Sequence, residues 1–337
     1  MTKSSLAKSD RQTQITGEYV IYWGIIWAAI SLAIYLNFSV VEANAARSPW
    51  FIMATIGLEE IGLLVSGWLC LRNYRYESIV SGRAVWLLFA LAMFTFFIGN
   101  LWFSAWELLW GLDPAASIGN VFFVLFYAIA IAAMRLAILD RDVQLVPQQW
   151  AIVGGVVALG LMMGCWLTTL SARAVPAPLV GSIAIVRADG STQAIVKTSL
   201  PPIDVPAANP RQIANSPQPP AWVLAIDRSM QPLVDSFNLF YVLCDLVLLT
   251  FAAILFLGFW GGRLGLPWRM VAQAVLCFYI ADTWFAYAHN RVQGYESGFI
   301  MEVFWIFGIV QFGIAAALEF DNSIRARRLA RRRTAIK

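Results

Sequence analysis

Acidic side chains lie within hydrophobic stretches that are long enough to cross a membrane. Asp282 and Glu302 lie on two successive stretches, and Asp245 lies on the stretch before them. An ionisable group at the centre of a membrane helix costs at least about 2.5 kcal/mol, so it is rarely kept there without a partner or a role. These acids therefore indicate either hydrogen bonds between helices or a site that binds a proton or a polar ligand.

Polar residues recur at equal spacing in the two halves of the chain. The spacing from Asn100 to Asn120 equals the spacing from Asp282 to Glu302, and IGNLWF around Asn100 aligns with IADTWF around Asp282. The pattern predicts a four-span unit that is repeated once. Because four spans return the chain to the same side of the membrane, the two copies would be parallel repeats.

The polar side chains share a depth along their expected spans. At 1.5 Å per residue they lie roughly 6–15 Å below one surface, in the outer half of the bilayer. We expect them to form a polar cavity or a hydrogen-bonded layer near the outside, with aromatic side chains beside it. The candidate ligand-binding or proton-sensing residues are Asp245, Asp282, Glu302, Asn100, Asn120, Glu59, Glu60, Trp284 and Trp305.

Three interpretations of this layer remain open. Asparagines and protonated acids can hold helices together, at about 0.6 kcal/mol per hydrogen bond. A proton or cation pathway would need polar groups that continue to the other face, and the inner half has few. In the third interpretation the layer recognises an external ligand or a proton, which then changes helix packing.

The sequence does not indicate catalysis or a bound cofactor. His289 is the only histidine, which excludes a multi-histidine zinc site or a bis-histidine haem within one chain. Asp245 and Asp282 are similar to the dyad of aspartyl intramembrane proteases, but YIAD stands where those enzymes carry GxGD. The four cysteines show no metal-binding spacing, and no glycine-rich phosphate loop is present. We therefore expect no enzyme activity, no cofactor and no metal.

Composition predicts an all-α integral membrane protein. The chain is 60% hydrophobic and 13% charged, with a mean hydropathy of +0.68. Apolar runs of about twenty residues each match the thickness of a bilayer. Eight spans are predicted, at 19–41, 50–71, 84–107, 116–138, 150–170, 236–260, 269–289 and 298–319.

Arginines predict the orientation, because short cytoplasmic loops are rich in basic residues. Alternate connections carry Arg72, Arg75 and Arg83, then Arg135 and Arg141, then Arg263 and Arg269. Both termini are therefore expected in the cytoplasm, with the protein in the inner (cytoplasmic) membrane. The basic run from Arg325 to Arg333 is expected to contact anionic membrane lipids and not nucleic acid.

A proline-rich connection between the fifth and sixth spans is expected outside the membrane. It contains two β-prone runs around Asp189-Gly190, which predict a hairpin, and a third β-prone run, AWVLAID. The predicted organisation is a cytoplasmic tail at 1–18, a first four-helix repeat at 19–138, a fifth span at 139–170, the external insertion at 171–235, spans six to eight at 236–320 and a basic tail at 321–337.

The last three spans resemble the multi-span N-terminal sensory region of some bacterial diguanylate cyclases and related signalling proteins. The matching stretches are FYVLCDLVLL, YIADTWFAYA, GYESG and MEVFWIFG, and SIGNVFFVLFYAIAIAAM is similar in the first half, with Asn120 where an aspartate is usual. The matching residues are Tyr241, Asp245, Leu248, Leu249, Asp282, Tyr295, Gly298, Glu302 and Trp305.

The resemblance implies a membrane sensory module whose C-terminus lies inside, where a catalytic output would follow. Only a short basic segment follows the last predicted span. We therefore expect a module that binds a small-molecule ligand or a proton and signals through a cytoplasmic or membrane protein partner, unless the sequence is a fragment. The alternatives are a non-catalytic accessory or assembly subunit of a membrane complex, and a transporter.

Overall fold

The structure, a computed structural model, describes residues 17–40, 47–140, 143–172, 184–186, 192–194, 218–260, 265–291 and 297–336. Within these residues, eight helices are long and apolar enough to cross a membrane. They are α2 (Gly17–Phe38), α3 (Pro49–Arg75), α4 (Arg83–Trp110), α5 (Gly119–Leu139), α6 (Pro147–Ala172), α9 (Val234–Gly258), α10 (Leu266–Arg291) and α11 (Val303–Ile336). The prediction of a helical chain with eight such segments is confirmed.

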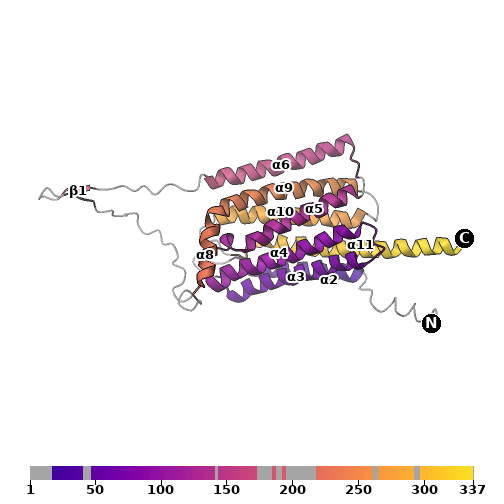
Figure 1. Ribbon diagram of the computed structural model, residues 1–337, viewed down its shortest axis with the longest axis horizontal. Coiled ribbons are helices and arrows are strands. Elements are labelled where there is room, and N and C mark those ends of the chain that lie inside the picture. The colour runs from indigo at the N-terminus through magenta and orange to yellow at the C-terminus, as the bar shows by residue number, and fades with distance from the viewer. Residues whose placement is uncertain are drawn as a thin grey trace.

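Six of these helices form a closed ring. Each contacts its two neighbours in the order α3, α4, α5, α9, α10, α11 and back to α3. Helix α2 packs outside the ring against α11, and α6 packs outside it against α9, so they lie at opposite edges of the bundle (Figure 1). Because α3 and α11 both begin at the end of the bundle that the arginine pattern places outside, we call this the outer end.

Glycines allow two pairs of ring helices to cross closely. A Cβ atom added at Gly119 of α5 would lie 2.7 Å from the carbonyl oxygen of Gly99 in α4. A Cβ atom at Gly308 of α11 would lie 2.7 Å from the ring of Phe278 in α10. Small residues permit such approaches between membrane helices. The first crossing brings the neighbouring residues Asn100 and Asn120 to the same level of the ring.

Helices α3 and α11 are joined by hydrogen bonds at intervals of seven residues. Ser66 donates to the carbonyl of Ile309 at 2.7 Å, and Asn73 donates to the carbonyl of Ala316 at 2.8 Å. One further interval along, the amide of Val80 donates to the hydroxyl of Ser323 at 3.0 Å. A seven-residue repeat is the spacing at which two helices keep the same faces in contact. This polar seam therefore defines the register of α3 against α11 in this structure.

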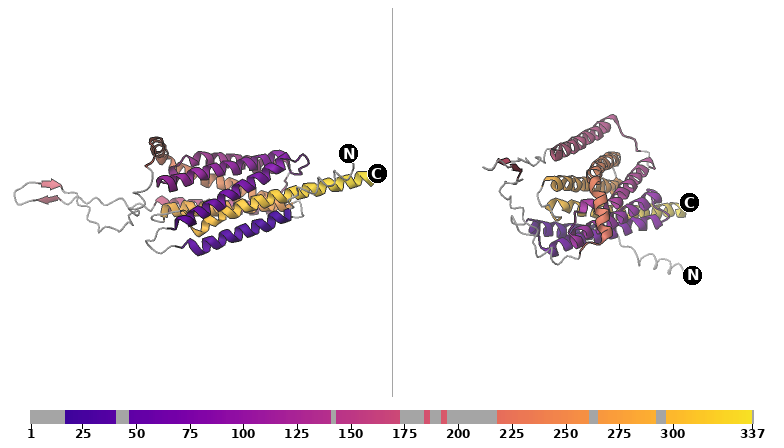
Figure 2. Two further views of the ribbon diagram at one scale, coloured as in Figure 1. Left: turned by 90° about the horizontal axis from the view of Figure 1, so that it is seen from below. Right: turned by 60° about the vertical axis from the view of Figure 1, so that its left-hand side comes forward.

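Helix α11 is longer than the sequence predicts. The eighth span was expected to end at residue 319, yet the helix continues through the basic run to Ile336 and leaves the bundle (Figures 1 and 2). Hydropathy marks where apolar residues end, whereas Arg and Ala continue a helix readily. At this end the amide of Gly17 donates to Asp321 at 2.8 Å, so α2 starts where α11 leaves the ring. Which side is cytoplasmic stays a prediction.

Short elements cover the outer end. They are η1 (Pro114–Ala116), α8 (Ala221–Met230), η2 (Gln231–Leu233) and η4 (Ile300–Glu302). In the connection between α6 and α8, β1 (Ala184–Val186) pairs antiparallel with β2 (Thr192–Ala194). The predicted turn at Asp189-Gly190 lies outside the described residues, and the external position of this insertion stays a prediction.

The prediction of a strand at AWVLAID is wrong, because these residues form most of α8, which crosses the outer end of the bundle (Figure 1). Trp222 packs edge-on against the rings of three tryptophans of α4, and Val223 is fully buried. A short apolar run does not distinguish a helix from a strand. Here the contacts with α4 favour a helix. The three tryptophans lie at ring distances of 5.9–6.4 Å and are Trp102, Trp106 and Trp110.

Candidate functional site

The ring encloses a cavity near the outer end, with a volume of about 100 Å³. A single water molecule needs about 10–15 Å³ by this measure, so the cavity has room for several waters or a small ligand. Six of the nine candidate residues line it: Glu59, Asn100, Asn120, Asp245, Asp282 and Trp305. They come from α3, α4, α5, α9, α10 and α11, so every helix of the ring contributes one.

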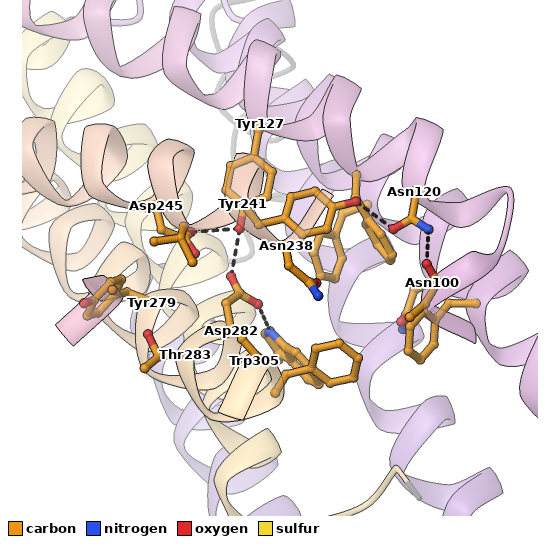
Figure 3. A pocket seen from close by; sticks show the side chains of 18 of the residues that line it. Asn100, Asn120, Tyr127, Asn238, Tyr241, Asp245, Tyr279, Asp282, Thr283 and Trp305 are labelled. Carbon is orange, nitrogen blue, oxygen red and sulfur yellow. Dashed lines mark hydrogen bonds between the residues drawn. The ribbon is translucent and has the colours of Figure 1, made fainter. Parts of the chain in front are cut away.

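Two aspartates of the cavity share one tyrosine hydroxyl. The hydroxyl of Tyr127 lies 2.8 Å from Oδ1 of Asp245 and 3.0 Å from Oδ2 of Asp282 (Figure 3). A phenol has one proton, so it donates fully to one carboxylate at a time. The second contact is satisfied when that carboxyl group is protonated and donates to the phenol oxygen. The arrangement therefore has a place for one proton between the two aspartates.

Asp282 also bonds to the last ring helix. The indole Nε1 of Trp305, in the first turn of α11, donates to Oδ1 of Asp282 at 2.7 Å (Figure 3). Asp282 thus uses one oxygen toward α5 and the other toward α11. Protonation or displacement of this carboxyl group would therefore alter hydrogen bonds to both α5 and α11.

Asn120 holds the wall of the cavity on the side of α5. Its Oδ1 accepts a hydrogen bond from the hydroxyl of Tyr241 at 2.8 Å. Its Nδ2 donates to the carbonyls of Ala115 at 2.8 Å and Ser117 at 3.1 Å, which fastens η1 to α5. The rings of Tyr241 and Tyr127 are stacked, with centroids 5.4 Å apart, so this network adjoins the aspartate pair.

A second group of acids lies on the side of α3. Glu59 and Glu60 are both buried, and Asn100 of α4 lies beside both carboxyl groups. Among the described residues, Nδ2 of Asn100 and both carboxyl oxygens of Glu60 have no hydrogen-bond partner. Buried polar atoms of this kind are usually satisfied by ordered water. This part of the wall is therefore suited to a hydrated cavity.

Three candidate residues do not line the cavity: Glu60, Trp284 and Glu302. Glu302 accepts hydrogen bonds from the amides of Gly298 at 2.6 Å and Phe299 at 3.2 Å, so it caps the turn that leads into α11. Trp284 packs against the ring of Phe299, with centroids 5.9 Å apart. Its indole N–H has no partner within the described part of the chain.

The list of candidate residues does not include five polar residues that line the cavity: Tyr127, Asn238, Tyr241, Tyr279 and Thr283. Tyr127 is the most consequential omission, because it joins the two aspartates. A tyrosine in a hydrophobic span is common near a membrane surface, so it does not stand out as an acid does. Its depth along the fourth predicted span, which matches the depth of the acids, is the sequence feature that could have indicated Tyr127.

Aromatic rings close the cavity on the side that faces the inner half. Below the cavity lies a void of only about 10 Å³, bounded by Tyr127 and the two aspartates on one side and otherwise by apolar side chains that include four phenylalanines. The rings of Phe126, Phe278 and Phe312 pack in sequence, with centroids 6.0 and 6.2 Å apart. Phe89 packs on Phe312 with centroids 5.4 Å apart. These four residues, the aromatic floor, separate the aspartates from the inner end of the ring.

The chain matches no protein-family model, no curated protein and no solved structure. Its function therefore has to follow from the chemistry of the cavity, since a fold by itself does not specify one. Among the described residues, no group of three or more His, Cys, Asp or Glu side chains is arranged to hold a metal ion. What the cavity offers is two carboxyl groups that share a phenol, a neighbouring glutamate, amide groups and aromatic faces.

Proposed function

We propose that this protein is a membrane-embedded recognition module that binds a small ligand or a proton in the ring cavity and signals through a partner. The observation that carries the proposal is the hydrogen bond between Asp282, in the cavity wall, and Trp305, in the first turn of α11. From Trp305 the same helix continues without interruption to Ile336, beyond the bundle. The cavity and the far end of the molecule thus belong to one continuous element.

The length of α11 makes it suited to carry a signal. Its 34 residues span about 51 Å at 1.5 Å per residue. A ligand that draws Asp282 away from Trp305 releases the outer end of this helix. The seam with α3 then allows a shift or rotation, the kind of helix movement by which switches respond to small local changes. A partner that contacts the extension of α11 would read that movement.

The aromatic floor favours recognition over transport. A transport pathway needs polar groups or water on both sides of the binding site. Below Asp245 and Asp282 the side chains are apolar and closely packed, so the cavity ends at the aspartates. A cavity that is closed toward the inner half is suited to binding and release on the same side.

Cysteine accessibility tests this arrangement. Thr283 lines the cavity, whereas Ala130 lies beside the aromatic floor. In a variant that lacks the four native cysteines, Thr283→Cys should react with a small impermeant methanethiosulfonate applied from the outer side. Ala130→Cys should remain unreactive from both sides, in right-side-out and inverted vesicles alike.

For each of the two cysteine variants, one result would contradict the proposed recognition function. Reaction of Ala130→Cys from the inner side would mean that water passes the floor, which favours a transporter. Absence of reaction at Thr283→Cys would mean that the cavity is closed to molecules from outside, which removes the basis for ligand recognition. Both variants must insert and purify as the parent does for the comparison to hold.

The order of the six ring helices fits the proposed duplication, whereas the two outer helices do not fit it, because α2 packs mainly on α11 and α6 mainly on α9. Helices α3, α4 and α5 follow one another around the ring, and α9, α10 and α11 follow in the same sense. Two parallel copies related by an axis along the membrane normal would produce this order. The resemblance to bacterial sensory regions supports the same proposal, with the acidic second copy supplying Asp245 and Asp282.

A role as an accessory subunit is the second candidate. The exposed basic stretch of α11 favours it, because a charged helix that leaves the bundle is suited to contact another protein or anionic lipid. Isolation in a mild detergent distinguishes the two roles. Stoichiometric co-purification with a large membrane complex would support the subunit and contradict a free-standing sensor.

A further inference from the structure

The charges of the cavity lining are all of one sign, which bears on the ligand that the proposed function requires. The ionisable acids in the lining are Glu59, Asp245 and Asp282. Among the described residues that line the cavity there is no lysine, arginine or histidine. An anionic ligand would therefore be repelled by any ionised carboxyl group, and a neutral apolar ligand would offer no donor to Oδ2 of Asp245.

One carboxyl oxygen is available to a ligand. Asp245 is only 5% exposed, and its Oδ1 accepts from Tyr127. Within the described residues, its Oδ2 takes part in no hydrogen bond. Figure 3 shows Asp245 and Asp282 directed toward the space between Tyr127 and Trp305. An acceptor that faces a cavity and has no protein donor is satisfied by water or by a ligand, so a ligand that supplies a donor is favoured.

Aromatic faces surround this acceptor. Three of the rings, Phe103, Phe123 and Phe285, pack edge-on, with centroids 5.8 and 6.2 Å apart. Such faces attract cations as well as apolar groups. The aromatic side chains in the lining are Phe96, Phe103, Phe123, Tyr127, Tyr241, Tyr279, Phe285 and Trp305.

We propose that the cavity binds a small organic ammonium ion with an apolar tail. Its N–H groups donate to Oδ2 of Asp245 and to Asp282, and its tail packs against the aromatic rings of α4, α5 and α10. The ammonium ion competes with the indole of Trp305 for Asp282. Occupancy thereby weakens the bond that ties α11 to the cavity. This assignment rests on the proposed function and specifies the chemical class of its ligand.

Two probes that differ chiefly in charge test the assignment. They are 2-phenylethylammonium and its neutral analogue 2-phenylethanol, titrated calorimetrically into the full-length protein in nanodiscs. The ammonium probe should bind saturably, and the alcohol should bind at least tenfold more weakly. Asp245→Asn should weaken the ammonium probe at least tenfold. Asp235→Asn, which changes an exposed acid at the start of α9, should alter its affinity less than twofold.

The remaining outcomes distinguish a failure of the ammonium assignment from a failure of the proposed recognition function. Equal binding of both probes, unaffected by Asp245→Asn, would overturn the ammonium assignment while leaving a ligand cavity in place. Binding of neither probe would also overturn the assignment. The proposed function is tested separately, because it is contradicted by a Thr283→Cys variant that does not react, whichever probe binds. If Asp245→Asn fails to purify as a monodisperse species, Asp282→Asn takes its place, with the same expected loss for the ammonium probe, because Asp282 is the second proposed acceptor.

Discussion

Asp282 is the residue at which the contacts of the cavity meet. One of its oxygens lies near the hydroxyl of Tyr127, and the other accepts from Trp305. Inside a membrane no bulk water replaces these partners, so each contact has to be made by the protein or by a ligand. Asp245 lacks an equivalent second partner among the described residues. The two aspartates therefore differ in their contacts: Asp282 joins two helices, and Asp245 is the proposed acceptor for a ligand.

Replacing Tyr127 by Phe should destabilise the protein by about 1–2 kcal/mol, because it removes the hydroxyl that serves two buried carboxyl groups. Unfolding by a denaturing detergent, followed by circular dichroism, measures the change. Tyr22→Phe is the matched control, since Tyr22 is 66% exposed on α2. Equal stability of the two variants would show that the shared hydroxyl contributes nothing to folding.

The sequence predicts the residues of this site better than it predicts their contacts. Acids and amides in apolar spans stand out by their cost, and depth along the spans places Asp245, Asp282 and Asn120 at one level. Depth does not reveal which helices are neighbours. Whether Tyr127 meets Asp245 depends on α5 contacting α9, which is a property of the folded ring. Glu302 shows the converse error, because an acid at the right depth serves to cap a turn.

Among the helices, α11 has the most varied contacts. Its first turn contributes Trp305 to the cavity, its middle packs on α3 through Ser66 and Asn73, and its last part leaves the bundle. Two hydrogen bonds of the seam, from Ser66 and Asn73, are made to backbone carbonyls, so they do not depend on a partner side chain. Such a seam holds α11 in place while still allowing a move to another register.

Ser66→Ala should lower stability by about 0.6–1 kcal/mol, because its hydroxyl bonds across the helix boundary to Ile309. Ser31→Ala is the control: Ser31 is equally buried, but its hydroxyl bonds to Trp27 within its own helix. The same detergent unfolding experiment compares them. A loss for Ser31→Ala as large as that for Ser66→Ala would contradict a special role for the seam.

The sequence predicts a helix where a long hydrophobic run determines it, and it does not predict a helix that depends on contacts with its neighbours. Apolar runs of about twenty residues identify all eight long helices, because crossing a membrane imposes that length. Helix α8 was missed because the contacts of Trp222 with α4 determine it. The extension of α11 was missed because its residues are polar yet favour a helix.

At the scale of the whole molecule, a ring of six helices surrounds a cavity that is closed beneath by the aromatic floor. Hydropathy does not predict this closure, since α2 and α6 are as hydrophobic as the ring helices and yet lie outside it. The ring nonetheless gives the acids of three helices one shared space. In this account, occupancy of that space and the position of the α11 extension are coupled.

The distance between the α11 extension and the loop that joins α3 to α4 tests this coupling most directly. Spin labels at Glu77→Cys and Ala326→Cys, both exposed, report it in a variant without the native cysteines. Trp305→Phe keeps the ring and removes the bond to Asp282, whereas Trp284→Phe removes an indole N–H that has no partner in the described structure. We predict that Trp305→Phe shifts the distance distribution by at least about 1–2 Å, the scale of helix movements in switches, while Trp284→Phe leaves it unchanged. A Trp305→Phe distribution that superimposes on that of the parent would contradict the coupling.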